Sequence, residues 1–175
     1  MKKTMALVLG ILLTATTLSA QTAGGVAPHV AILKSQAETI RSLVVRTAEK
    51  VPETDYAFKP TPDVRSLGAL IGHIADGNNL LCGMAAGDKT PPDFSNEKKT
   101  TRADLVAALN ASFAACDKVF AATTDANAAT PLDFFGQKQT RLGMLAFTNS
   151  HMWEHYGNLV TYMRLKGIVP PSSER

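Results

Sequence analysis

The sequence predicts an all-α protein, a four-helix bundle, from three observations. Four long segments carry apolar residues at alternating intervals of three and four, which is the period of an amphipathic helix. Proline, glycine and asparagine separate these segments, and all three residues favour helix ends or turns. Alternating runs of β-branched residues are scarce, so little of the chain favours a sheet. Amphipathic helices of this kind bury their apolar faces against one another, which gives a bundle.

Residues 1–20 precede the first of these segments and resemble an export signal. Lys2 and Lys3 give it a positive start, residues 5–13 form a short apolar run, and small residues lead up to Ala20. The apolar run is too short to remain in a bilayer as an anchor. We therefore predict a signal peptide over residues 1–20, cleavage after Ala20, and export to the periplasm or the medium without a membrane anchor.

The first predicted helix covers residues 28–50 and the second covers residues 66–86. Pro28 suits a first helical turn, because the N–H groups of that turn stay unpaired and proline has none. Ser66 is a good N-cap, because its hydroxyl can accept a hydrogen bond from the first turn. Gly87 favours the left-handed conformation that follows many helices. These signals place three of the four helix ends.

The third predicted helix covers residues 102–123 and the fourth covers residues 140–166. Thr101 and Asp104 resemble a capping box at the start of the third helix, with aspartate in place of the usual glutamate. Between these two helices we expect a short extended piece around residues 132–135. The remaining connections are rich in proline, which breaks helices, so we expect them to be irregular.

Composition indicates one domain and argues against a nucleic-acid surface. The chain has 175 residues, with 18 basic and 15 acidic side chains and a net charge of +3. Aromatic residues make up only 6% of the chain, and Lys98 and Lys99 form its most conspicuous basic cluster. A protein that binds nucleic acid usually gathers basic and aromatic side chains on one face. We therefore expect no nucleic-acid partner.

The stretch SHMWEHYGNLVTYMRLKG in the fourth helix contains two of the four histidines. His151 and His155 are one turn apart, so both point to the same side of the helix and suit a shared metal ion. Glu154 lies about 60° around the helix from His151, at the edge of that site. The H-x-x-E-H string is also typical of inverted zinc proteases, which need a distant downstream carboxylate. The one glutamate after His155 is Glu174, in a polar tail, so any third ligand must come from upstream.

His73, in the stretch LGALIGHIADGN of the second helix, is the upstream candidate. Bundles bind metals between facing helices, which favours this assignment. A single histidine among apolar residues is also often a core residue that hydrogen-bonds to the backbone. The residues alone leave both interpretations open. His29, in the first turn of the first helix, is interpreted as an ordinary exposed residue.

The stretches SLGALIGHIADGN and HMWEHYGNLVTYMRLKGIVPP resemble the DinB-like family, and the resemblance extends over about residues 27–171. It implies one four-helix bundle domain over these residues. It also implies that a histidine on the second helix joins an H-x-x-x-H pair on the fourth to bind a divalent metal. The matching positions are His73, His151 and His155. The resemblance further implies a long crossover between helices two and three, which then run parallel.

Three neutral imidazoles on one ion leave a coordination position open for water or substrate. This ligand set favours Zn²⁺, and it also suits Ni²⁺ or Fe²⁺. The ion can activate water or polarise a bound group. We therefore expect the catalytic base to be water at the metal or Glu154. Asp76 and Asn158, one turn after His73 and His155, are candidates to hold the second ring nitrogens.

The resemblance leaves two classes of function open. DinB-like relatives include S-transferases that use low-molecular-weight thiols, and metal-dependent hydrolases. Export disfavours the thiol transferases, because those thiols are cytosolic. We expect an exported metal-dependent hydrolase or transferase that acts on an unknown small molecule, and we leave a homodimer open. The alternative is a non-catalytic bundle whose metal is structural or sequestered. A sealed site would favour that role, and an open cleft would favour catalysis.

Cys82 and Cys116 are the two cysteines of the chain. In an oxidising compartment such a pair is usually bridged. If helices two and three run parallel, as the resemblance implies, the two cysteines lie within about 1.5 Å of each other in height. Antiparallel helices would place them too far apart for a bridge. We predict a disulfide, and two unpaired core cysteines are the alternative.

Overall fold

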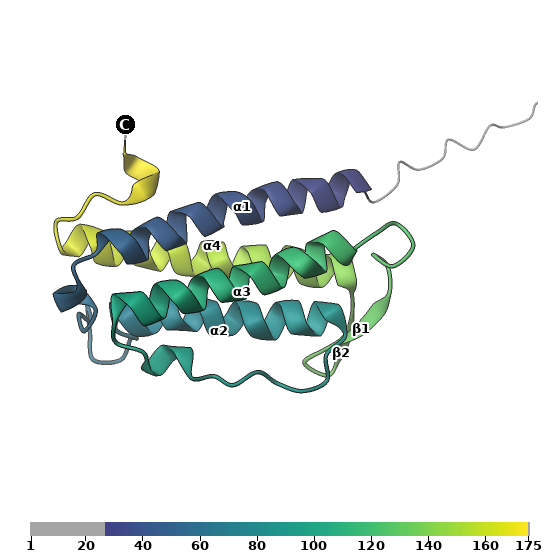
Figure 1. Cartoon of the computed structure of the whole chain (residues 1–175), viewed down its shortest axis with the longest axis horizontal. Coiled ribbons are helices and arrows are strands. Elements are labelled where there is room, and N and C mark those ends of the chain that lie inside the picture. Colours follow the sequence, from purple (N-terminus) through teal and green to yellow (C-terminus); the bar gives the residue numbers. More distant parts are fainter. Residues whose placement is uncertain (1–26, 175) are drawn as a thin grey trace, which may run out of the picture.

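The computed structural model describes residues 27–174 and confirms the predicted four-helix bundle (Figure 1). The helices are α1 (Ala27–Lys50), α2 (Leu67–Ala86), α3 (Arg102–Ala122) and α4 (Arg141–Leu165). Short 3₁₀ helices lie in the connections and the C-terminal segment: η1 (Glu53–Asp55), η2 (Asn96–Lys98) and η3 (Pro171–Ser173). The predicted signal peptide, residues 1–20, falls outside the described residues.

The predicted capping residues define where the helices begin. Ser66 and Thr101 each accept a hydrogen bond from the backbone of the turn that follows, and Thr140 caps α4 in the same way. An N-cap stands outside its helix, which is why α2 and α4 begin one residue later than predicted. Gly87 takes the expected left-handed conformation after α2, with a φ of 98°.

A short β-hairpin precedes α4. β1 (Pro131–Phe134) pairs antiparallel with β2 (Gln137–Thr140), and Phe135 and Gly136 form the turn. The sequence predicted an extended piece at residues 132–135 but no partner strand, and Phe135 belongs to the turn instead. β2 is polar and exposed along its whole length, so it lacks the apolar alternation by which strands are recognised.

α2 and α3 run parallel, as the family resemblance implied (Figure 1). A hydrogen bond from Asn78 to Ser112 and a disulfide between Cys82 and Cys116 each join residues 34 apart in the sequence. Two helices can keep a constant separation between contacting residues only if they run in the same direction. The Cα atoms of the two cysteines are 5.2 Å apart, and the predicted disulfide is confirmed.

A long connection, residues 87–101, is called the crossover here. It returns the chain from the end of α2 to the start of α3 along the outside of the bundle, and it includes η2 (Figure 1). Gly72 of α2 permits its close approach, because a Cβ atom at this position would lie 2.2 Å from the carbonyl oxygen of Asn96. The crossover thus packs directly on α2, the helix that carries His73.

The core lies between the four helices. Buried apolar side chains from every helix fill it, among them Ile40, Val44, Ile71, Ile74, Leu105, Leu109, Met152 and Leu159. α3 is long and apolar enough to cross a membrane by length and composition alone. Its packing against α1 and α2, and its disulfide to α2, identify it as a core helix of the bundle.

Candidate metal centre

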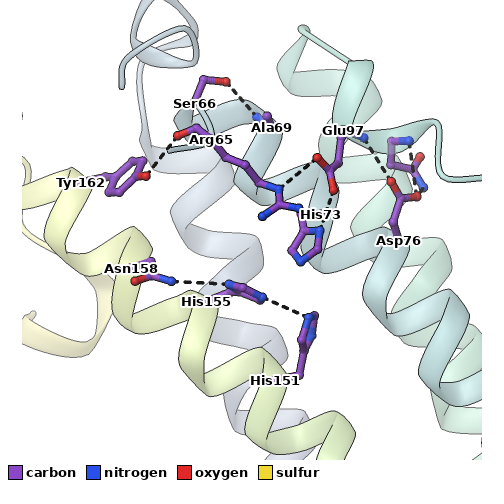
Figure 2. A network of polar contacts seen from close by, with 11 residues as sticks. Arg65, Ser66, Ala69, His73, Asp76, Glu97, His151, His155, Asn158 and Tyr162 are labelled. Carbon is purple, nitrogen blue, oxygen red and sulfur yellow. Dashed lines mark hydrogen bonds and ion pairs between the residues drawn. The ribbon is translucent and has the colours of Figure 1, made fainter. Parts of the chain in front are cut away.

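α2 and α4 bring His73, His151 and His155 together (Figure 2). One nitrogen of each ring lies within 4.8 Å of a nitrogen of each of the other two rings. The Nε2 atoms of His151 and His155 are 3.0 Å apart. The structure therefore assembles the three residues that the sequence predicted as metal ligands, whereas His29 is exposed on α1.

The arrangement of the rings fits one divalent ion. Zn–N bonds of about 2.1 Å would place two nitrogens on a tetrahedral ion roughly 3.4 Å apart. The 3.0 Å between the Nε2 atoms of His151 and His155 is close to this spacing. Two neutral ring nitrogens this near repel each other unless a proton or a cation lies between them. Imidazole nitrogens without a thiolate suit Zn²⁺, Ni²⁺ and Fe²⁺ alike, so the donor set does not choose among them.

The environment of α4 keeps its two histidines in the neutral form that binds metals. Burial, followed by the charges of His155 and His73, lowers the pKa of His151 to about 4. Burial is also the main reason why the pKa of His155 lies below its ordinary value. A neutral imidazole offers a lone pair to a metal, and a protonated imidazole does not. Both rings are therefore ready to bind a cation at neutral pH.

Glu97 of η2 orients the ring of His73 (Figure 2). Its carboxylate oxygens lie 2.6 Å from Nδ1 of His73 and 3.0 Å from Nε of Arg65. Burial acts to raise the pKa of Glu97, but hydrogen bonds from Arg65 and His73 outweigh burial and lower the pKa. An ionised carboxylate accepts the proton on Nδ1 of His73, which leaves Nε2 of the same ring as the ligand atom.

The role of Glu97 was missed in the sequence. It lies 24 residues from His73, in a connection with several other charged residues. Only the path of the crossover brings it onto α2. The family resemblance, which implied a long crossover beside α2, was the one signal that pointed to this segment, and it did not single out the residue.

Asp76 hydrogen-bonds to the crossover, and not to His73 as the sequence predicted. Its side chain is 1% exposed. The carboxylate accepts hydrogen bonds from the side-chain amide of Asn96 at 2.6 Å and from the backbone N–H of Glu97 at 3.2 Å. Asp76 follows His73 by three positions, so its side chain leaves the helix about 60° around the axis from that of His73. This angle directs Asp76 away from α4 and toward the crossover. Asp76 therefore acts on His73 only by holding the segment that carries Glu97.

Asn158 lies beside His155, as predicted. Its side-chain nitrogen is 3.5 Å from Nδ1 of His155 (Figure 2). A ring that binds a metal through Nε2 carries its proton on Nδ1 and needs an acceptor there. Rotation of the amide by half a turn would present the side-chain oxygen of Asn158 to this proton.

Glu154 is exposed on α4 and lines neither of the two clefts that reach the histidines. Its charge acts to raise the pKa of His155, against the larger effect of burial. Glu97 is the carboxylate that touches the cluster. The predicted catalytic role of Glu154 stays a prediction.

Two clefts give small molecules access to the histidines. The first cleft, with a volume of about 450 Å³, is lined by His73 and His151 among others. The second cleft, with a volume of about 710 Å³, is lined by His155. Arg65 and Glu97 line both clefts, so the ion pair between them stands where the two meet the cluster. The histidine cluster is thus open and not sealed in the core.

Fold and site together define a class of protein, a helical bundle with a parallel middle pair, a long crossover and a three-histidine centre. The sequence also matches the family model of the DinB superfamily over residues 36–159. The chain therefore belongs to the DinB superfamily, and the resemblance seen in its helices is confirmed.

Solved structures share this fold. A DinB-like protein from Bacillus cereus has a TM-score of 0.69 at 16% identity, over 79% of this chain and 93% of that one. For a DinB-like protein from Bacillus subtilis the TM-score is 0.66 at 24% identity, over 82% and 99% of the two chains. An uncharacterised protein from Escherichia coli has a TM-score of 0.62 at 15% identity, over 79% and 95%. At these identities the likeness shows the fold alone. Comparison with curated proteins gives no match.

Proposed function

We propose that this protein is exported, binds one divalent metal ion through His73, His151 and His155, and uses the ion to hydrolyse a small molecule. Zn²⁺ is the first candidate, and Ni²⁺ or Fe²⁺ are the alternatives for the same donors. The three-nitrogen donor set supports metal binding. The open clefts beside it support catalysis.

Access to the histidines is the observation that carries the proposal. Structural zinc sites are closed by four protein ligands, whereas catalytic sites keep one position for water or substrate. Within residues 27–174, three histidines form the group that could hold an ion, and clefts of about 450 and 710 Å³ adjoin them. The carboxylate of Glu97 is engaged by His73 and Arg65, so it is not a free fourth ligand.

Residues of the chain prepare this site for a Lewis acid. A bound divalent ion would supply the chemistry that makes water nucleophilic at neutral pH. Glu97 keeps the proton of His73 on Nδ1, and Asn158 is placed to do the same for His155. Arg65 lines both clefts, where its outer N–H groups can donate hydrogen bonds to an anionic or carbonyl oxygen of a substrate.

Export is supported by two features that do not depend on each other. One is the order of charge, apolar run and small residues over positions 1–20. The other is the disulfide, because disulfides persist in oxidising compartments. Protein isolated from the periplasm or the medium should begin at Gln21. An intact N-terminus on protein confined to the cytoplasm would contradict export and reopen the thiol-transferase alternative.

Metal analysis of single variants tests the site. We expect one ion per chain in the wild type and the loss of stoichiometric binding in His73→Ala, His151→Ala and His155→Ala. His29→Ala is the matched control, because His29 is exposed on α1 and lies outside the cluster. Full metal occupancy in His73→Ala would remove that residue from the site.

Turnover tests the reaction. Hydrolysis of a panel of esters, phosphoesters and amides should disappear on chelation and return with Zn²⁺. Glu154→Gln should slow a responsive reaction if Glu154 is the base, and unchanged turnover would end that role. Full metal occupancy without turnover of any substrate would favour the non-catalytic alternative.

A further inference from the structure

Aromatic side chains form a large part of the first cleft. Phe94 of the crossover, Phe135 of the hairpin turn and Phe147 of α4 line it together with His73 and His151. The three phenylalanine side chains are 48%, 65% and 45% exposed. Three segments that are distant in the sequence thus each bring an exposed ring to one cleft beside the histidines. Large apolar groups that gather on a surface in this way indicate a binding site.

Phe135 occupies a backbone conformation that its residue type disfavours. Its φ is 53°, and that of Gly136 is 82°, so both turn residues are in the left-handed region. Two-residue hairpin turns of this kind normally begin with asparagine, aspartate or glycine. Among the described residues Phe135 is the one non-glycine residue with positive φ. Because folding alone favours a different residue here, the strained aromatic side chain points to a function.

Phe134 packs against two of these rings. The centroid of its ring lies 4.8 Å from that of Phe135 and 4.9 Å from that of Phe147, both in edge-to-face geometry. Phe134 is only partly exposed and packs against the core. The rings of Phe135 and Phe147 are therefore held by a partly buried neighbour, which favours a preformed binding surface.

The polar part of the first cleft is mostly engaged within the protein. Asp76 holds the crossover, and Arg65 and Glu97 pair with each other. His73 and His151 remain to act through a metal ion on a polar head group. With a volume of about 450 Å³ the cleft is in the range of small-ligand sites.

We infer that the substrate carries a compact apolar group, about the size of one aromatic ring, next to the group that meets the metal. The apolar group packs among Phe94, Phe135 and Phe147, and the head group lies at the histidines. Edge-to-face contacts favour an aromatic ring over an aliphatic chain of equal size. This inference rests on the proposed function and adds the chemical class of the substrate.

Two hydroxamates that share one chelating group test the inference. Benzohydroxamate carries a phenyl ring and acetohydroxamate carries a methyl group. In isothermal titration calorimetry of the Zn²⁺-loaded protein, benzohydroxamate should bind about tenfold more tightly, because the cleft buries the additional apolar surface. Equal binding of both compounds would overturn the inference and leave the metal site intact.

Phe135→Asn removes the ring and keeps the turn, because asparagine accepts positive φ. We expect this variant to lose most of the preference for benzohydroxamate while its affinity for acetohydroxamate stays unchanged. Phe147→Ala should act in the same direction. Ile32→Ala is the control, since it removes a side chain that is 56% exposed on α1 and lines neither cleft.

An unchanged preference in both Phe135→Asn and Phe147→Ala would also overturn the inference. Metal analysis of the same samples separates this failure from a failure of the proposed function. Protein that holds no ion and binds neither hydroxamate would overturn the proposed function, and the inference with it.

Discussion

Gly77 of α2 decides how closely the ring of His151 can approach. A Cβ atom at this position would lie 2.4 Å from Cε1 of His151, a distance that no real contact tolerates. Gly77→Ala should therefore displace the ring and weaken metal affinity about tenfold or more, as loss of a ligand's support does. Competition with a chromophoric chelator measures the change.

Gly157 of α4 provides the matched control. It also lies inside a helix, but nothing stands within 4 Å of a Cβ atom placed there. Gly157→Ala should keep metal affinity and stabilise the protein by about 0.5–1 kcal/mol through helix propensity. Equal metal affinity in the two variants would show that Gly77 does not govern the ring.

Asp76 acts on His73 indirectly, through the crossover. Asp76→Asn loses the charge that accepts hydrogen bonds from Asn96 and from the backbone of Glu97. The crossover should loosen, Glu97 should leave His73, and metal affinity should fall about 10- to 100-fold. Unfolding stability should fall by about 1–3 kcal/mol, because asparagine keeps one acceptor oxygen and one of the two partly buried donors loses its partner.

A residue of the same connection serves as the control for Asp76. Asp93→Asn removes the same charge from an exposed position in the crossover and should change neither quantity. Glu97→Gln should reproduce the loss of metal affinity with a smaller loss of stability, since its side chain is less buried. If Asp76→Asn binds metal like Asp93→Asn, the link from Asp76 to the cluster is absent.

The lowered pKa values of His151 and His155 make the metal-free protein sensitive to acid. The pKa of His151 is about 4 in the folded protein and roughly 6.5 in the unfolded chain. Between these values the unfolded chain binds more protons, so stability falls as pH decreases. Urea unfolding in the presence of a chelator should show stability that is full above about pH 6.5 and declines toward pH 4. The double variant His151→Asn/His155→Asn should show a weaker decline, and an identical decline would contradict the assignment.

At the scale of elements, the disulfide ties α2 to α3. It closes a loop between cysteines separated by 34 residues, which the chain-entropy model values at about 3–4 kcal/mol. The double variant Cys82→Ala/Cys116→Ala should lose a stability of that order in denaturant unfolding. Unreduced, denatured wild-type protein should expose no free thiol, and two reactive thiols would rule the bridge out.

The helices could be predicted from the sequence because their signals are local. Ser66, Thr101 and Gly87 act on the turns beside them, so their effect can be predicted without knowledge of the tertiary structure. The pair His151 and His155 follows from helical periodicity in the same way. His73 required the family resemblance, since periodicity alone could not distinguish a ligand from a core histidine.

The remaining parts of the site depend on contacts between distant segments. Glu97 reaches His73 only because the crossover packs on α2 at Gly72. Because of the same packing, Asp76 hydrogen-bonds to the crossover and not to His73. β2 was missed because a short polar strand is defined by its neighbour, and the aromatic cleft because its rings come from three segments.

At the scale of the whole molecule, α2 is the helix on which the other parts of the site converge. α4 packs on it antiparallel, since His73 lies near His155 and Gly77 lies near His151. The crossover and α3 also pack on α2. One helix therefore holds a proposed metal ligand, the residue that anchors the crossover, and one cysteine of the disulfide, so changes in α2 should affect stability and metal binding together.

The parallel pair places two helix dipoles side by side in the same direction. Each helix carries a dipole equivalent to roughly half a unit charge at either end, positive at the N-terminus. In an antiparallel pair neighbouring dipoles offset each other, whereas α2 and α3 place like ends side by side. Acidic groups stand at the positive end of α3, where Glu53 accepts a hydrogen bond from the backbone of Arg102 and Asp104 lies in the first turn. Neither helix has a basic residue in its last turn. α1 and α4 run in the opposite direction and place their positive N-termini at the end where α2 and α3 have their C-termini, so the dipoles of the whole bundle largely offset one another. Within the pair, the disulfide holds together two helices whose dipoles oppose their alignment.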